Sequence, residues 1–391
     1  LYLLILIFAG FVFDFSLKEI KWLVIIGFNQ VLVGIILYLR SNLSALLLFK
    51  RDGLLSVIDR LILILFCGYF IWVKTTHTFI TIDFFILSQT FAYLITISIG
   101  LLSLVKFSKI PKIQWDKLFF ALIIKKSIPY AILIFLMSVY YYSDVIMVEK
   151  IRSNIEVVSY AYGYRFFLAF NMLGFLFAGL LLPIFSKLIA EKRSVVPLSW
   201  LSFKLIYFFA FVICISIWTY KSEILKWRYG ITNSVLEHSS DTFGWLMVSF
   251  IAISCNYIFG TLLTANGSLK SLNILAVFGI IINIFLNLFL IPESGSVGAA
   301  FASAFTQFFI LIFQFILCFK YFKFNYHIFS IIQILSFTLF SILGAYNLNI
   351  LSSINWNYKL LITVLMGFIF GMILKLINLK EFYQLIKTSK S

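Results

Sequence analysis

The residues most able to do chemistry in this sequence are a few charged side chains inside long apolar runs. Lys126 precedes Pro129 in one run, and Arg165 lies among tyrosines in the next. An ionisable side chain inside a membrane span costs several kcal/mol unless it faces a cavity or a partner. Arg165 can grip a phosphate group through two parallel hydrogen bonds, and Lys126 can add a second positive charge. These residue types indicate binding of an anionic headgroup within a membrane.

Both residues also have a structural interpretation. Long basic side chains near the end of a span can extend their charge to the membrane surface, and an arginine among aromatic residues is typical of the membrane interface. Lys125 is an alternative to Lys126, but adjacent residues point about 100° apart on a helix. Lys126 shares a face with Pro129 and Tyr130, so we expect Lys126 in the binding site.

Three more charged residues follow the run that contains Lys126. Asp144 stands at its outer end, and Lys150 and Arg152 come next. They form either a solvated loop, in which exposed ion pairs contribute little, or the outer mouth of a binding site. The predicted substrate-binding residues are therefore Lys126, Asp144, Lys150, Arg152 and Arg165.

Neutral polar and small residues occur at helical spacing in two further runs. Asn283 and Asn287 lie four residues apart, and Gln307 and Gln314 lie seven apart, so each pair shares a helix face. Such amides usually form hydrogen bonds between membrane helices. Small residues within 295–303 permit the close approach of a neighbouring helix.

The elements that carry these residues are predicted to be membrane-spanning helices. The residues AVILMFWYC make up 62% of 391 positions, charged residues make up 12%, and the mean hydropathy is +1.06. A soluble domain has about 25% charged residues, and barrel strands would alternate every second residue. Since a helix satisfies its own backbone hydrogen bonds, we predict an all-α polytopic membrane protein. The twelve apolar segments are 1–13, 20–48, 54–73, 79–105, 118–142, 157–188, 195–219, 242–264, 271–291, 295–320, 327–347 and 357–379.

Several function classes lack their sequence signals. The net charge of +16 is spread in short clusters between apolar runs, which argues against nucleic-acid binding. The cysteines and histidines are scattered singly, so we expect no metal and no cofactor. The sequence has no P-loop, GxSxG or HExxH motif, and we therefore predict that the protein is not an enzyme.

The distribution of basic residues predicts the orientation of the chain. The loops after the second, fourth, sixth, eighth and tenth segments, with the C-terminal tail, hold most of the Lys and Arg found in loops. This bias predicts a cytoplasmic C-terminus. The sequence starts with Leu1 in an apolar run too short to span and without the charged region of a signal peptide. We therefore interpret it as N-terminally truncated.

A weak internal echo is also present. Residues from Leu48 to Asp59 match residues from Leu262 to Asn273 at a constant offset, which pairs Gly53 with Gly267. Both stretches are predicted to cross a short cytoplasmic turn between two helices. The echo suggests a parallel internal repeat, with a pseudo-twofold axis along the membrane normal.

The order of these motifs resembles the polysaccharide-export flippases of the multidrug/oligosaccharidyl-lipid/polysaccharide superfamily. Trp115–Lys187 is similar to the seventh and eighth helices of that family, through Pro129 and the motifs SDVIMVEK, VVSYAYGYRFF and LLPIFSKL. Two further stretches keep the family's order: LSALLLFKRDGLLSVIDR and TANGSLKSLNILAVFGIIINIFLNLFLIPESGSVGAAFAS. The resemblance spans essentially the whole chain.

The resemblance implies a MATE-like protein of the bacterial cytoplasmic membrane, with fourteen helices and two six-helix bundles as parallel repeats. This chain would hold the rest of the N-terminal bundle (1–106), the C-terminal bundle (107–320), and two extra helices with a basic tail (321–391). The implied function is to flip an undecaprenyl-diphosphate-linked oligosaccharide to the outer leaflet for biosynthesis of surface polysaccharide, such as lipopolysaccharide. The implied partners are the bilayer, this lipid, and polysaccharide polymerases or glycosyltransferases of the same pathway. Lys126 and Arg165 would lie in a cationic cavity between the bundles.

Two relatives in the superfamily and one enzyme class are the alternatives. A lipid II flippase would also have a cationic cavity, whereas a drug or cation antiporter should carry membrane-embedded acids. A membrane glycosyltransferase or polymerase would need a large catalytic loop, and the longest non-apolar gap is Tyr220–Asp241. The embedded charges are mostly basic, which favours an anionic substrate.

Overall fold

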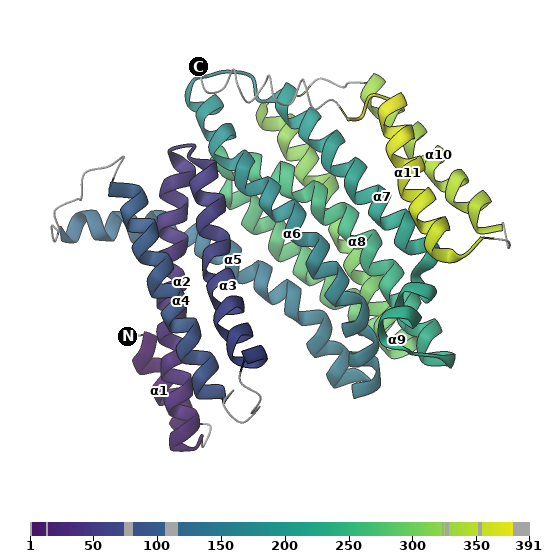
Figure 1. Cartoon of the computed structure of the whole chain (residues 1–391). Helices are drawn as coiled ribbons and strands as arrows, with labels where there is room; N and C mark the ends of the chain where they lie inside the picture. The colour runs from purple at the N-terminus through teal and green to yellow at the C-terminus, as the bar shows by residue number, and fades with distance from the viewer. Residues whose placement is uncertain are drawn as a thin grey trace. The chain divides into compact units, whose positions relative to one another are not determined.

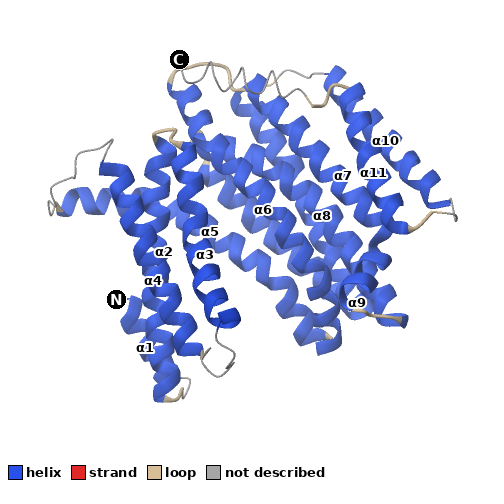
Figure 2. Cartoon of the chain, in the orientation of Figure 1, coloured by secondary structure: helices blue, strands red, loops and turns tan. Residues whose placement is uncertain are grey.

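The computed structural model describes residues 2–12, 15–73, 81–105, 116–322, 324, 328–350 and 354–377. In these ranges the chain forms helices joined by turns, without strands (Figure 2). Ten of the helices described are long and apolar enough to cross a membrane, which confirms the all-α polytopic prediction. The helices in Figure 1 are α1 Tyr2–Val12, α2 Leu17–Ala45, α3 Phe49–Val73, α4 Ile82–Val105, α5 Lys117–Ile151, α6 Asn154–Ala190, α7 Val196–Tyr229, α8 Asn233–Ala265, α9 Leu269–Phe322, α10 Ile328–Ile350 and α11 Trp356–Ile373.

Two predicted segments, 271–291 and 295–320, form the single bent helix α9. The bend lies at Gly295, whose φ of 55° interrupts the helix. Pro292 lacks a backbone N–H for the helical ladder, and glycine adopts a positive φ at little cost. These two residues therefore turn the chain sharply without a loop.

The sequence prediction of where helices end was wrong at two places. The helix that begins near residue 118 continues to Ile151, so Asp144 lies inside α5 rather than at its outer end. The supposed gap Tyr220–Asp241 is mostly helical, since α7 ends at Tyr229 and α8 begins at Asn233. Both stretches are rich in polar residues, which on their own predict a loop.

The chain divides into two compact units, Leu1–Trp115 and Asp116–Ser391. In the first unit α2, α3 and α4 pack on one another, around buried Leu39, Leu43 and Leu55. In the second unit α8 lies at the centre and contacts α6, α7 and α9, while α10 and α11 pack on α7. The sequence placed its first boundary after residue 106 and a second after residue 320; that three-part division stays a prediction.

Four helices end in the same kind of turn. In the α6 turn, Arg193 N–H donates to Leu188 O at 2.9 Å, and Lys192 N–H donates to Ile189 O at 3.0 Å. This pair of bonds is the Schellman motif, which satisfies the last carbonyls of a helix. The residues with positive φ in the four turns are Leu47, Lys192, Gly267 and Lys375.

The positions of these turns show that the matched sequence stretches are not aligned in the structure. Gly267 has a φ of 74° and forms the turn between α8 and α9, whereas Gly53 lies inside α3. The equivalent of Gly267 in the α2–α3 turn is Leu47, with a φ of 57°. The echo therefore pairs residues that occupy different structural positions.

Replacing Lys192 with glycine is expected to stabilise the protein by about 0.5–1 kcal/mol. A side chain costs about 1–2 kcal/mol in the left-handed conformation, and glycine gives back part of that gain through the entropy of the unfolded chain. The shift is measured by thermal unfolding in detergent. Lys204→Gly is the control, because Lys204 lies inside α7 and glycine there should destabilise by about 1 kcal/mol. A lower melting temperature for Lys192→Gly would show the prediction to be wrong.

Candidate functional site

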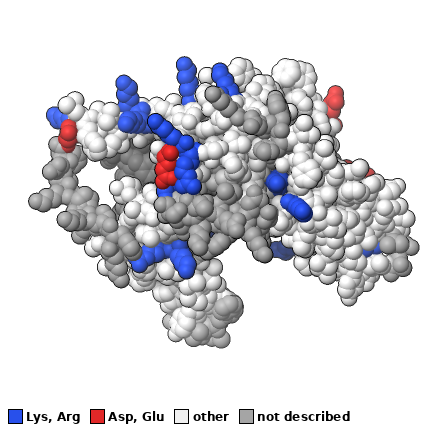
Figure 3. All heavy atoms as spheres, turned by 90° about the horizontal axis from the view of Figure 1, so that it is seen from above, with Lys and Arg blue, Asp and Glu red and all other residues white. Residues whose placement is uncertain are grey.

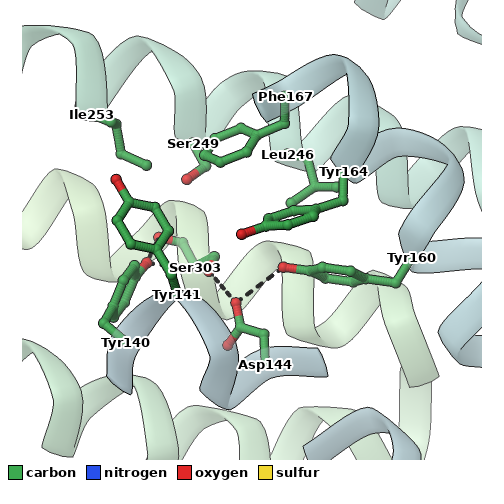
Figure 4. A pocket seen from close by; sticks show the side chains of 10 residues that line it. All are labelled: Tyr140, Tyr141, Asp144, Tyr160, Tyr164, Phe167, Leu246, Ser249, Ile253 and Ser303. Carbon is green, nitrogen blue, oxygen red and sulfur yellow. Dashed lines mark hydrogen bonds between the residues drawn. The ribbon is translucent and has the colours of Figure 1, made fainter. Parts of the chain in front are cut away.

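A buried carboxylate forms the centre of the candidate site in the second unit. Asp144 of α5 is 3% exposed. Its Oδ2 accepts hydrogen bonds from the hydroxyl of Tyr160, at 3.1 Å, and from that of Ser303 (Figure 4). Its Oδ1 accepts from Nδ2 of Asn287 at 2.7 Å. Three helices therefore converge on one carboxyl group.

The bend in α9 makes this convergence possible. Asn287 lies before the bend and Ser303 after it, and on a straight helix the two residues would be about 24 Å apart. Because the chain turns at Gly295, both side chains reach the same carboxylate. The two halves of α9 thus each supply one polar side chain, Asn287 and Ser303, to the Asp144 carboxylate.

Neutral amides and hydroxyls surround this first set of contacts. Asn283 Oδ1 accepts from Asn287 Nδ2 and from Ser143 Oγ, both at 3.2 Å. The hydroxyl of Tyr140 donates to Ser303 Oγ at 3.2 Å. The prediction that the asparagines form hydrogen bonds between helices is confirmed, since Asn283 and Asn287 both bond residues of α5.

The Asp144 cluster borders a small internal space. This space is about 10 Å³ and is lined by residues that include Tyr141, Tyr164 and Ser249 (Figure 4). It has room for one water molecule or one small ion. Within the described part of the chain, no lysine, arginine or histidine forms an ion pair with Asp144.

The chemistry open to this cluster is the exchange of a proton or a small hard cation. A buried carboxylate without a basic partner carries a cost of several kcal/mol unless a proton or a cation neutralises it. Two of its three hydrogen-bonding neighbours are the hydroxyl oxygens of Tyr160 and Ser303, and oxygen atoms are the ligands that hard cations prefer. The Oδ1 of Asn287, whose Nδ2 bonds Asp144, is buried and lacks a partner. The described residues contain no cluster of three or more His, Cys, Asp or Glu that could hold a metal ion.

The structure places the predicted binding residues in different surroundings. Lys126 on α5, Lys150 at the end of α5, and Arg165 on α6 are exposed. None of these three is a hydrogen-bond partner of Asp144. Asp144 itself is buried rather than part of a solvated mouth. The roles of all five residues in substrate binding stay predictions.

Arg152 has a structural contact that the sequence did not indicate. Its Nε donates to Ile291 O at 3.1 Å, and its Nη2 donates to Glu293 O at 3.0 Å. These carbonyls lie just before the bend in α9 at Gly295. Arg152 therefore anchors the first half of α9 to the turn between α5 and α6.

Glu156 holds the other side of the same bend. Its Oε2 accepts from the backbone N–H of Ser296 at 2.9 Å and lies 2.8 Å from Nε2 of His238. A Cβ atom at Gly295 would come within 2.6 Å of the Glu156 carboxyl carbon. Glycine is thus required both for the bend and for the close approach of Glu156.

Comparison with known proteins identifies a similar fold but no family. No protein-family model matches the chain, and no curated protein matches it. Among solved structures, the lipid II flippase MurJ in an inward closed conformation is 16% identical, with a TM-score of 0.61 over 95% of this chain and 80% of that chain. A MOP superfamily transporter from Pyrococcus furiosus is 17% identical, with a TM-score of 0.42 over 58% of this chain and 53% of that chain. The chain is a multi-pass helical membrane protein with the fold of the lipid II flippase.

Proposed function

We propose that this protein is a transporter that flips an undecaprenyl-diphosphate-linked oligosaccharide across the bacterial cytoplasmic membrane for surface polysaccharide biosynthesis. The observation that carries the proposal is the fold similarity to a lipid II flippase along 95% of the chain. The motif order, which resembles polysaccharide-export flippases, supports an oligosaccharide as the cargo. A sugar head with a diphosphate cannot cross hydrocarbon unaided, so such a substrate needs a transporter.

The two helices with the predicted phosphate-binding residues support this role. Lys126 lies on α5 and Arg165 on α6, and the two helices meet at the turn near Arg152. Beyond the turn α5 packs mainly on α9, whereas α6 packs mainly on α8. Both basic side chains are exposed, and at 1.5 Å per residue they lie about 20 Å apart along the hairpin, so each would contact a different part of a long glycolipid. Rocking of one bundle against the other around a bound substrate is the expected transport motion.

The orientation in the membrane is part of the proposal. Basic side chains outnumber acidic ones on the face drawn in Figure 3. Exposed Lys192 in the α6–α7 turn and Lys270 at the start of α9 belong to loops that the sequence predicts to be cytoplasmic. An excess of Lys and Arg is typical of cytoplasmic loops. We therefore expect the C-terminus in the cytoplasm.

Two alternatives each have one observation in their favour. The similar solved structure is a lipid II flippase, which favours lipid II as the cargo. The buried Asp144 favours a drug or cation antiporter, because a membrane-embedded acid is the feature that such a protein should carry.

Complementation separates these functions. The intact protein should restore surface polysaccharide in cells that lack their polysaccharide flippase. It should not restore growth of cells depleted of their lipid II flippase. Restored growth without restored polysaccharide would replace the proposal with lipid II transport. Drug resistance without either would replace it with antiport.

Replacing Arg165 with alanine is expected to reduce polysaccharide export by about tenfold or more, since a charge-assisted hydrogen bond contributes about 1.5–3 kcal/mol. Export is measured by surface polysaccharide staining, with the amount of protein in the membrane measured in parallel. Arg228→Ala serves as the control, because Arg228 is exposed near the end of α7 and has no predicted role. Export at the wild-type level in Arg165→Ala would exclude Arg165 from phosphate binding.

A further inference from the structure

A large cavity lies within the second unit, next to the Asp144 cluster. Its volume is about 610 Å³. It shares Tyr140, Tyr141 and Ile253 with the small space beside Asp144. The helices α5, α6, α8 and α9 all contribute to its wall. The cavity is thus large enough for an organic ligand and adjoins the one buried acid of the candidate site.

The cavity opens between α5 and α6. Ile134 and Met137 of α5 and Gly179 and Leu182 of α6 line it and are exposed. The lining residues from α8 and α9 are buried or half-buried. The opening therefore faces the gap between the two helices that carry Lys126 and Arg165.

The lining carries hydrogen-bonding groups but no charge. The Nδ2 of Asn256 donates to Gln307 Oε1 at 2.9 Å, which joins α8 to α9. The Oδ1 of Asn256 and the Oε1 of Gln314 are buried without hydrogen-bond partners. Such amides are costly in an apolar surrounding unless a ligand or a water pairs with them. The other hydrogen-bonding residues in the wall are Ser138, Tyr140, Tyr141, Tyr257, Thr261 and Thr264.

Aliphatic side chains from all four helices, together with aromatic rings, form the rest of the wall. Phe175 and Tyr257 lie edge to face, with their ring centroids 6.3 Å apart, and both line the cavity with Tyr141. A sugar ring has hydroxyl groups on its edge and C–H bonds on its faces. Neutral amides and hydroxyls pair with the first, and aromatic and aliphatic side chains pack against the second. A polyprenyl chain would leave the amides unpaired.

We infer that this cavity binds an uncharged sugar unit of the transported glycolipid, which rests on the proposed function. The lining contains no Lys, Arg, His, Asp or Glu. A carboxylated sugar would lose its hydration there without gaining a basic partner. The cavity therefore selects neutral sugars over acidic ones, and Gln314 is a specificity-determining residue.

The test measures equilibrium binding of three lipids to the intact protein in nanodiscs. The probes are undecaprenyl diphosphate, the same lipid with one N-acetylglucosamine, and the same lipid with one glucuronic acid. We expect the N-acetylglucosamine lipid to bind about tenfold more tightly than the sugar-free lipid, as two or so neutral hydrogen bonds would give. The glucuronic acid lipid should show no such gain.

Two variants test whether this cavity causes the preference for the N-acetylglucosamine lipid over the sugar-free lipid. Gln314→Leu should lower the ratio of the two affinities about fivefold without changing the affinity for the sugar-free lipid. Gly179→Phe should abolish this preference, because Gly179 lines the cavity, the space next to it is open, and the new ring would occupy space that the sugar needs. Gln333→Leu is the control for the first, since Gln333 of α10 is as buried as Gln314, at 8% exposure, but lies outside the cavity. Gly53→Phe in α3 is the control for the second, because the space beside Gly53 is also open.

The outcomes separate this inference from the proposed function. Equal affinities of the wild type for all three lipids would overturn the sugar pocket and leave the flippase proposal standing. A preference that survives both Gln314→Leu and Gly179→Phe would also overturn it. Weaker binding of the sugar-free lipid to Gly179→Phe would identify a lipid chain as the occupant instead. Absence of binding by any of the three lipids would overturn both proposals.

Discussion

Replacing Asp144 with asparagine is expected to reduce transport by about tenfold or more while the protein still reaches the membrane in normal amounts. Asparagine has nearly the same shape as aspartate but cannot take up a proton or balance the charge of a cation. Its amide also offers one acceptor oxygen to the three donors Tyr160, Asn287 and Ser303. An interaction with a charged group contributes about 1.5–3 kcal/mol, which corresponds to the expected loss.

A binding measurement tests whether this effect reflects a coupling ion. The melting temperature of the wild type should change with sodium concentration or with pH, because a ligand of the folded state stabilises it by mass action. The melting temperature of Asp144→Asn should not respond to sodium, and it should respond less to pH than that of the wild type, since other pairs such as Glu156 and His238 still titrate. Asp241→Asn is the control: Asp241 is half exposed and pairs with Lys221 at 2.6 Å, far along the chain from the cluster. Full transport by Asp144→Asn would show that the buried carboxyl has only a structural role.

Replacing Gly298 with alanine is expected to destabilise the protein by about 2–3 kcal/mol and to lower the yield of folded protein. The new Cβ would meet the backbone of Leu290, with 2.7 Å to the carbonyl carbon. A backbone carbonyl cannot move aside as the end of a side chain can. The bend of α9 would therefore have to open, which would also separate Asn287 from Ser303.

The matched control for this prediction is Gly53→Ala. No atom lies within 4 Å of the position that its Cβ would take, and Gly53 is exposed inside α3. Alanine there should stabilise the helix by about 1 kcal/mol. The two variants should thus shift the melting temperature in opposite directions, as measured by size-exclusion chromatography after heating in detergent. A shift in the same direction would contradict the account of the α9 bend.

The sequence predicted the helices well where they are apolar and poorly where they are polar. The apolar runs correspond to helices because length and hydrophobicity alone decide whether a segment can span a membrane. The last turns of α5 contain Asp144, Glu149 and Lys150, and this polarity indicated a loop. The stretch is helical because Asp144 finds its partners inside the unit rather than in water.

The site was only partly predictable. The sequence indicates Asp144 as a candidate, but its partners Asn287 and Ser303 lie 143 and 159 residues further along the chain. Only the packing of α9 on α5, together with the bend, brings them near. The unpartnered amide of Gln314 became visible through the cavity beside it. Lys126 and Arg165 were selected by residue type, and their exposure agrees equally with ligand binding and with contact with the membrane surface.

The contacts of Arg152 and Glu156 have a mechanical consequence. Arg152 bonds carbonyls on one side of the α9 bend, and Glu156 bonds an N–H on the other side. Both residues belong to the junction of α5 and α6. If the α5–α6 hairpin tilts, we therefore expect the bend of α9 to move together with it. The hydrogen-bond distances from Asp144 to Asn287 and Ser303 should then stay the same during such a movement.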